Sequence, residues 1–144
     1  MNAQLIIPAG GSGSRLGKDI PKALVPIAGK PILYWTLKQL LKIEWVDNPI
    51  VIVPPGYVDT FQKEVIQKYN LPFCNFVEGG HERQFSVYNG LQHVSKQAEI
   101  VVIHDCARPF VPIQCVYESI EKADTVGAAT VAIPSINTIL EVDE

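Results

Sequence analysis

The stretch "AQLIIPAGGSGSRLGKDIPK", residues 3–22, changes abruptly from an apolar run to a polar loop rich in glycine. Residues 3–7 predict a buried strand because bulky apolar side chains follow one another at its end. The loop adds little to any core, yet it contains Arg15, Lys18 and Lys22. Bare backbone and positive charge directly after a strand predict a site for an anionic ligand.

The same change from apolar run to polar loop recurs along the chain. Residues 31–41, 57–69, 83–94 and 112–123 carry the apolar periodicity of amphipathic helices. Strands are predicted between them, at residues 3–7, 50–53, 74–77, 100–104 and 127–132. Strands separated by helix-length segments require crossover connections and a mainly parallel sheet. We therefore predict an α/β fold with a Rossmann-like sheet that is covered by helices on both faces.

Length and charge restrict the function further. The 144 residues, 47% of them hydrophobic, are enough for one domain, residues 1–144, with a sizeable core. The net charge of −3 is unevenly divided, because residues 1–42 carry +5 and the remainder carries −8. Such local positive charge favours a small anionic ligand over nucleic acid. No apolar run approaches the ~20 residues that a membrane helix needs.

The cysteines and the N-terminus favour the cytoplasm. Cys74, Cys106 and Cys115 are odd in number and lack C-x-x-C spacing, as expected for reduced thiols. The N-terminus lacks the pattern of a secretion signal, so we expect a cytoplasmic protein.

Two common phosphate-binding motifs do not match the first loop. A dinucleotide-binding G-x-G-x-x-G motif that starts at Gly11 would need glycine where Leu16 stands, which argues against a nicotinamide oxidoreductase. The P-loop pattern is absent as well. Arg15 offers a planar fork of donors and Lys22 a mobile charge, so the two together could hold a triphosphate.

Polar segments follow the later predicted strands: "EGGHERQFS" at 78–86, "HDCARP" at 104–109 and "PSINT" at 134–138. Ligands of parallel sheets bind at the carboxyl ends of strands, so these loops are expected to line one crevice. Asp105 could bind magnesium there directly or through water, or could instead cap the following turn. Arg108 could bind substrate or form a structural ion pair. We interpret His104 as a packed histidine and Cys106 as a small filler.

Three segments together resemble a known family. "PAGGSGSRLGKDIPKALVPIAGKPIL" is similar to the signature of sugar-phosphate nucleotidyltransferases, with G-x-G-x-R followed by P-K. "GGHERQFSVYNGL" and "HDCARPFV" narrow the resemblance to the 2-C-methyl-D-erythritol 4-phosphate cytidylyltransferase family. The likeness extends from about Ala3 to Thr138 and implies a nucleotidyltransferase-type fold.

The resemblance implies a role for each matching residue. Arg15 and Lys22 correspond to catalytic cations, and Arg83 is expected to brace the second loop. His81 stands where the family often has Asp, and Cys106 where it usually has Ala. Substrate contacts are implied for Asp105, Arg108 and Thr138, with Asp105 also the metal ligand. Nucleotide contacts are implied for Pro8, Ala9, Gly10, Gly11, Gly13, Gly80, His81, Ser86, Asp105 and Cys106.

The implied reaction is magnesium-dependent transfer of CMP from CTP to a sugar or polyol phosphate, with release of pyrophosphate. The expected acceptor is 2-C-methyl-D-erythritol 4-phosphate, used in isoprenoid precursor synthesis. Asn137 and Leu140 replace an acid and a base of the family pattern, so ribitol 5-phosphate stays open as an acceptor. A nucleotide-binding fragment without activity is a further alternative.

Members of the family continue beyond the length of this chain. The resemblance implies that they add a dimerisation arm, another substrate-phosphate cation and a last sheet strand. We therefore expect a truncated core domain here, and a homodimer in the full-length form.

Overall fold

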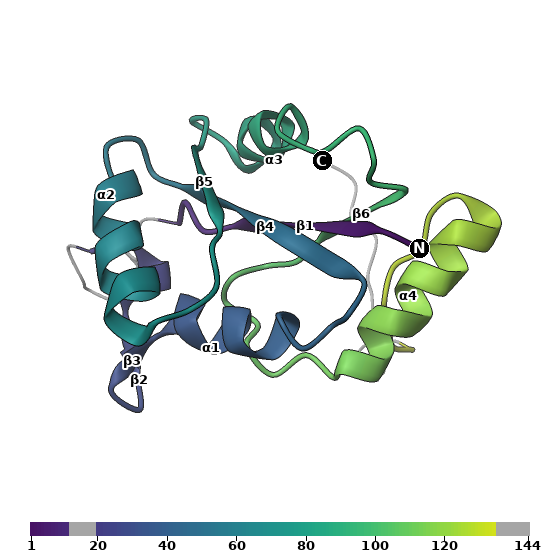
Figure 1. Ribbon diagram of the computed structural model, residues 1–144, viewed down its shortest axis with the longest axis horizontal. Helices are drawn as coiled ribbons and strands as arrows, with labels where there is room; N and C mark the ends of the chain where they lie inside the picture. Colours follow the sequence, from purple (N-terminus) through teal and green to yellow (C-terminus); the bar gives the residue numbers. More distant parts are fainter. Residues whose placement is uncertain (12–19, 135–144) are drawn as a thin grey trace, which may run out of the picture.

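The computed structural model describes residues 1–11 and 20–134, which form a parallel sheet flanked by helices (Figure 1). The four-stranded sheet has the order β5-β4-β1-β6, and every neighbouring pair of strands is parallel. Its strands are β1 (Ala3–Pro8), β4 (Val46–Val53), β5 (Asn75–Glu78) and β6 (Ile100–Ile103). The predicted parallel α/β architecture is confirmed.

Helices lie on both faces of the sheet (Figure 1). They are α1 (Ile32–Leu40), α2 (Val58–Phe61), α3 (Arg83–Leu91) and α4 (Ile113–Val126), and α2 continues as a π-helical stretch, Gln62–Gln67. Alternating strand residues separate the two faces: Leu5 and Ile7 pack in the large core with α1, α2 and α4. Ile6 belongs to a smaller cluster on the other face, which α3 covers.

Close packing of α3 depends on Gly90. A Cβ at this position would lie 2.8 Å from Ile52 Cδ1 and 3.1 Å from Ile6 Cγ2. Contacts this short would force the tightly packed Ile52 and Ile6 side chains to shift, so glycine lets the helix lie near to β1 and β4 without that displacement. Gly90 lies near the end of α3, so this contact holds the last turn of the helix against the sheet.

A short hairpin connects the first loop to α1. It follows a 3₁₀ turn, Lys22–Leu24, and consists of β2 (Pro26–Ile27) and β3 (Lys30–Pro31). The indole nitrogen of Trp35 donates a hydrogen bond to the Ile27 carbonyl oxygen at 2.8 Å. Lys30 Nζ donates to the Tyr34 hydroxyl at 3.0 Å and lies 4.3 Å from the centre of that ring. The hairpin is therefore fastened to α1 by side chains of the helix itself.

The strand predicted at residues 127–132 is wrong. Gly127 ends α4 in the left-handed conformation, with φ 90° and its N–H bonded to the Ala123 carbonyl oxygen. Residues 128–134 form neither helix nor strand, and Val131 and Ile133 are 64% and 86% exposed. Their β-branched side chains favour an extended backbone, but a strand also needs a partner and an apolar cover. In the part of the chain that the structure describes, β6 is an edge strand.

Candidate functional site

A cleft of about 640 Å³ lies at the carboxyl ends of β1 and β6. Its volume is in the range of small-molecule sites. Segments from five parts of the chain line it: Pro8, Ala9, Gly11, Lys22, Ala23, Ile32, Arg83, Asp105, Cys106, Ala107 and Arg108. The structure therefore brings seven of the predicted site residues to one cleft: Pro8, Ala9, Gly11, Lys22, Asp105, Cys106 and Arg108.

Backbone hydrogen bonds place the first wall of this cleft. The Ala9 N–H donates to the Ile52 carbonyl oxygen at 2.7 Å, so the chain keeps to the sheet until the loop begins. Where the described chain resumes, the Lys22 N–H donates to the Gly11 carbonyl oxygen at 2.9 Å. The two ends of the loop are thus held together, with Ala23 buried and the Lys22 side chain exposed. The Lys22 side chain can meet a ligand because the segment is anchored by the Lys22 backbone and by the buried Ala23, not by the ammonium group.

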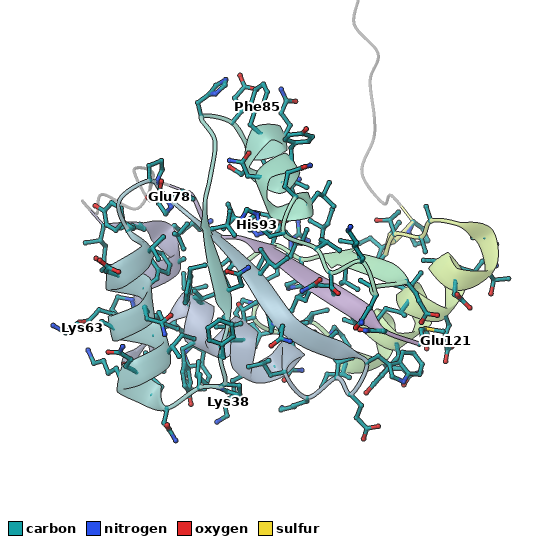
Figure 2. The ribbon with its side chains drawn as sticks, turned by 45° about the horizontal axis from the view of Figure 1, so that its top comes forward. Lys38, Lys63, Glu78, Phe85, His93 and Glu121 are labelled. Carbon is teal, nitrogen blue, oxygen red and sulfur yellow. The ribbon has the colours of Figure 1, made fainter. Side chains whose placement is uncertain are left out.

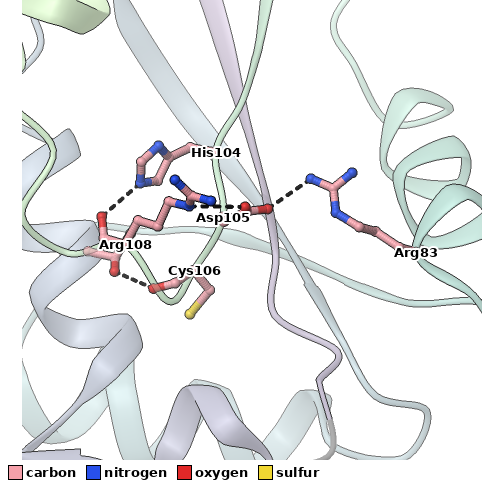
Figure 3. A network of polar contacts seen from close by, with 6 residues as sticks. Arg83, His104, Asp105, Cys106 and Arg108 are labelled. Atoms are coloured by element: carbon pink, nitrogen blue, oxygen red, sulfur yellow. Dashed lines mark hydrogen bonds and ion pairs between the residues drawn. The ribbon is translucent and has the colours of Figure 1, made fainter. Parts of the chain in front are cut away.

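The turn after β6 lines the cleft as well, and Figure 3 shows its polar contacts. Arg83 Nη2 donates to Asp105 Oδ1 at 2.8 Å, and Arg108 Nε lies 3.4 Å from Asp105 Oδ2. The hydrogen bond from Arg83, together with the charges of both arginines, holds the pKa of the Asp105 carboxyl below its usual value. The ion pair that was the alternative reading of Arg108 is therefore present in the structure.

The backbone of this turn is also tied down. His104 Nε2 lies 2.9 Å from the Arg108 carbonyl oxygen, and the Arg108 N–H donates to the Asp105 carbonyl oxygen at 3.1 Å. His104 is half-buried and directed at its own turn, in agreement with its interpretation as a packed histidine. The Asp105 side chain bonds to arginines, whereas its backbone closes the turn.

The cleft is positively charged. Among its described lining residues, Lys22, Arg83 and Arg108 oppose the single carboxylate of Asp105. Because a cleft concentrates the field of its charges, this excess attracts anions. The arrangement fits the phosphate-binding role that the sequence predicts for the first loop.

Two α1 side chains support the same turn, and sequence reasoning missed both. The buried Thr36 hydroxyl donates to the Cys106 carbonyl oxygen at 2.6 Å. Gln39 Nε2 donates to the Val111 carbonyl oxygen at 3.0 Å. The sequence did contain one indication of the Thr36 contact. This threonine lies on the apolar stripe of a predicted helix, three residues after Leu33 and one before Leu37. A polar group on a buried stripe usually has a hydrogen-bond partner.

Burial disfavours ionisation of the Cys106 thiol. Its side chain is 5% exposed, and burial raises the pKa of the Cys106 thiol to about 12. Burial also raises the pKa of Cys74 to about 12, while Cys115 is only half-buried. These values support the interpretation of Cys106 as a filler rather than a nucleophile.

We expect an alkylating reagent at about pH 8 to modify Cys115 in the native protein, because only a thiolate reacts at an appreciable rate. Cys74 and Cys106 should react only after unfolding. Mass spectrometry of peptides, before and after addition of denaturant, measures this difference. Labelling of Cys106 in the native protein as fast as that of Cys115 would contradict the assignment.

The loop between β5 and α3 is held by the predicted residue Ser86. The Gly80 N–H donates to Ser86 Oγ at 3.1 Å, and Ser86 Oγ donates to the Glu82 carbonyl oxygen at 3.1 Å. A Cβ on Gly80 would lie 2.5 Å from Phe85 Cβ, so glycine is required there. The His81 ring stacks on Phe85 with centroids 4.4 Å apart. Figure 2 shows Phe85 at the end of α3 that stands away from the sheet.

The remaining predicted site residues do not line the cleft or lie outside the described part of the chain. Gly80, His81 and Ser86 gather beside one another, but they are not among the residues that line the cleft. Gly10 is exposed between two lining residues. Gly13, Arg15 and Thr138, like Asn137 and Leu140, lie outside the described residues. Arg83, expected to brace its own loop, instead bridges that loop to Asp105.

A parallel sheet with a glycine loop after its inner strand β1, and with cations at the same edge, is typical of a nucleotidyltransferase-type α/β protein. The structure of a 4-diphosphocytidyl-2C-methyl-D-erythritol synthase matches 99% of this chain with a TM-score of 0.76 at 26% identity. The corresponding synthase from Anaerococcus prevotii matches 85% of it with a TM-score of 0.71. The chain belongs to the family described as IspD, 2-C-methyl-D-erythritol 4-phosphate cytidylyltransferase, whose model matches residues 3–144.

Curated relatives carry the same description. A 2-C-methyl-D-erythritol 4-phosphate cytidylyltransferase of Caldanaerobacter subterraneus is 42% identical over 146 residues. Another, from Clostridium botulinum, is 40% identical over 139 residues. The chain spans 64% and 62% of the lengths of these two relatives. Within residues 1–11 and 20–134, none of the helices has the length and apolar character to cross a bilayer.

Proposed function

We propose that the chain provides the nucleotide-binding part of a CTP-dependent cytidylyltransferase. It would join CMP to 2-C-methyl-D-erythritol 4-phosphate and release pyrophosphate. The observation that carries the proposal is the cleft itself, where Gly11 backbone, Lys22 and Arg108 converge on one space of a suitable size. Membership of the family supports the choice of nucleotide and of acceptor.

The proposed chemistry needs no covalent intermediate. A phosphate oxygen of the acceptor attacks the α-phosphorus of CTP in line, and a new oxygen–phosphorus bond forms. The bond from that phosphorus to the β-phosphate oxygen breaks, and pyrophosphate leaves with the electron pair. A phosphate dianion is already a nucleophile, so the protein contributes position and charge stabilisation. Lys22 would stabilise the charge that accumulates on the transferred phosphoryl group.

Magnesium fits this site as a companion of the triphosphate. Within the described residues, His, Cys, Asp and Glu side chains do not form a group of three that could hold a metal alone. Magnesium is usually bound by one or two carboxylates together with substrate phosphates, and Asp105 provides one such carboxylate in the cleft. When bound, the ion would neutralise phosphate charge and make the α-phosphorus more electrophilic. Asp105 could bind it directly, through the oxygen lone pairs that the two arginines leave free, or through a bridging water.

The base side of the site is proposed at the loop after β5. Gly80 and Ser86 fix one another there, and His81 is held by its stacking on Phe85. A rigid backbone edge can pair with cytosine and leave polar groups unpaired when another base is present. The homodimer and the cytoplasmic location expected from the sequence stay predictions.

We expect pyrophosphate release with CTP to exceed that with UTP, ATP or GTP by at least about 100-fold, because buried polar groups left unpaired are costly. The assay compares the four nucleotides with 2-C-methyl-D-erythritol 4-phosphate and then repeats CTP with ribitol 5-phosphate. Equal turnover with UTP would contradict the assignment of the base side. Product formed only from ribitol 5-phosphate would replace the proposed acceptor. If calorimetry shows that CTP binds but no product forms, the chain would have a nucleotide-binding function only.

A further inference from the structure

Arg83 occupies a position that its own helix does not favour. It is the first residue of α3, where the helix dipole places positive charge. The first turn of this helix has no acidic residue, and the neighbouring carboxylate, that of the N-cap residue Glu82, makes no side-chain capping hydrogen bond. A cation at this end opposes the dipole, so helix formation does not explain the choice of arginine.

The partner of Arg83 is distant in the sequence. Its guanidinium donates to Asp105 at 2.8 Å across 22 residues, from the start of α3 to the turn after β6. Figure 3 shows Arg83 and Arg108 approaching the carboxylate from opposite sides. The two side chains of the Arg83–Asp105 pair are 65% and 42% exposed. Ion pairs this exposed add little to stability, so overall folding does not explain the pair either.

The ion pair between Arg83 and Asp105 instead fixes the orientation of the Asp105 carboxylate. A carboxylate bonded at one oxygen can still rotate, whereas Asp105 is held at Oδ1 by Arg83 and at Oδ2 by Arg108. The contact with Arg108 is made within one turn and moves with that turn. The contact with Arg83 comes from outside it, from a helix packed on β1, β4 and β5. The orientation of Asp105 therefore depends on where α3 begins.

The start of α3 depends in turn on the loop that precedes it. The Ser86 hydroxyl bonds to the backbone of Gly80 and Glu82, and Gly80 fits directly against Phe85. Arg83 follows Glu82 without an intervening residue, so a displacement of the loop would displace the guanidinium. One hydrogen bond thus links the loop of residues 79–82 to the carboxylate in the cleft.

We propose that Arg83 is a positioning residue that couples the loop of residues 79–82 to Asp105. Ordering of the loop by the nucleotide base holds the guanidinium in place, and the guanidinium orients the carboxylate toward the acceptor. In this proposal Arg83 acts on the reaction through Asp105 rather than by contact with the reacting atoms. The roles given to the loop of residues 79–82 and to Asp105 rest on the proposed function. The coupling between the loop and Asp105 rests on the geometry.

A double-mutant cycle tests the coupling during turnover. We expect Arg83→Gln to lower kcat about 10- to 100-fold, as loss of a group that orients another usually does, with less than about a threefold change in the KM for CTP. In an Asp105→Asn background, Arg83→Gln should have less than about a threefold further effect, because the group it positions is gone. Arg83→Lys should recover part of the rate. Lys68→Gln, which removes a helix cation bonded to Glu64 at 2.8 Å, is the matched control and should change nothing.

Hydrogen exchange tests the same coupling without turnover. Asp105→Asn should accelerate amide exchange in residues 79–83, and Arg83→Gln should accelerate it in residues 105–108, whereas Lys68→Gln should affect neither. Equal rate losses from Arg83→Gln in both backgrounds, or exchange confined to the mutated segment, would overturn the proposal. A protein that shows the exchange coupling but transfers no CMP would refute the proposed function instead.

Discussion

Replacement of Lys22 by alanine is expected to lower the rate of pyrophosphate release by about 10²- to 10³-fold, the usual effect of losing one group that stabilises charge in a transition state. The Lys22 side chain lines the cleft and is exposed, so its removal leaves no cavity in the core. Its backbone hydrogen bond to Gly11 is retained in the variant. We therefore expect a large loss of rate with little change in the melting temperature.

Two further variants make this result specific. Lys42→Ala removes an exposed cation from the same basic N-terminal region, at a distance from the cleft, and should leave the rate unchanged. Arg15→Ala should resemble Lys22→Ala if the role implied for Arg15 by the family resemblance holds. Single-turnover rates and thermal unfolding curves of the three variants provide the comparison. Near-normal pyrophosphate release by Lys22→Ala would remove Lys22 from the mechanism.

The second large effect concerns the acceptor. Joining the C-terminal part of the Caldanaerobacter relative to this chain should raise kcat/KM for the acceptor roughly 10- to 150-fold, the equivalent of one charge-assisted contact of about 1.5–3 kcal/mol. Among the described residues, only Asp105 and Arg108 are implied to contact the acceptor, and Arg108 is already paired with Asp105. The family resemblance implies another substrate-phosphate cation in the part that the longer relatives add.

The same fusion should also raise the melting temperature. A groove of about 820 Å³ lies between β6 and α4, and Val101 and Ile103 on the strand are 36% and 46% exposed. A further strand paired with this edge would bury apolar surface and remove unpaired backbone groups. CTP affinity should change little, because every residue implied to contact the nucleotide lies between Pro8 and Cys106 of this chain. An unfused chain that equals the fusion in acceptor affinity and in rate would contradict this account.

The pattern of apolar residues was sufficient to predict the strands of the sheet wherever the apolar run is continuous. The strands predicted at 3–7 and 100–104 agree with β1 and β6 to within one residue at each end. The strand predicted at 50–53 begins four residues earlier, at Val46, because Asp47, Asn48 and Pro49 interrupt the apolar run. The pairing register shifts at this point, and Asn48 has φ 40°. An irregularity of this kind lets polar residues and proline lie in a strand that propensity alone would end.

The sequence allowed us to predict which loops form the candidate site, but not the hydrogen bonds that join them. Motif spacing identified the loops, and the rule that ligands gather at carboxyl ends of parallel strands predicted that the first loop and the 104–109 turn would meet. The hydrogen bond from Arg83 to Asp105 and that from Thr36 to the Cys106 backbone join residues 22 and 70 positions apart. Such pairs depend on the relative placement of whole elements, which no local pattern records. The same limit explains the wrong strand at 127–132, since a sequence does not show whether a partner is present.

The hydrogen bonds of α1 have a mechanical consequence. At its first residue, the Ile32 N–H donates to the Val25 carbonyl oxygen at 3.0 Å, and the Val25 N–H donates to the Lys22 carbonyl oxygen at 3.1 Å. One turn later, Thr36 holds the backbone beneath Asp105. The backbones that carry Lys22 and Asp105 are therefore both hydrogen-bonded to the same helix, α1. Thermal motion of α1 as a rigid body moves both residues in the same direction. Their separation is set by the body of the helix rather than by the exposed loops on which they are displayed.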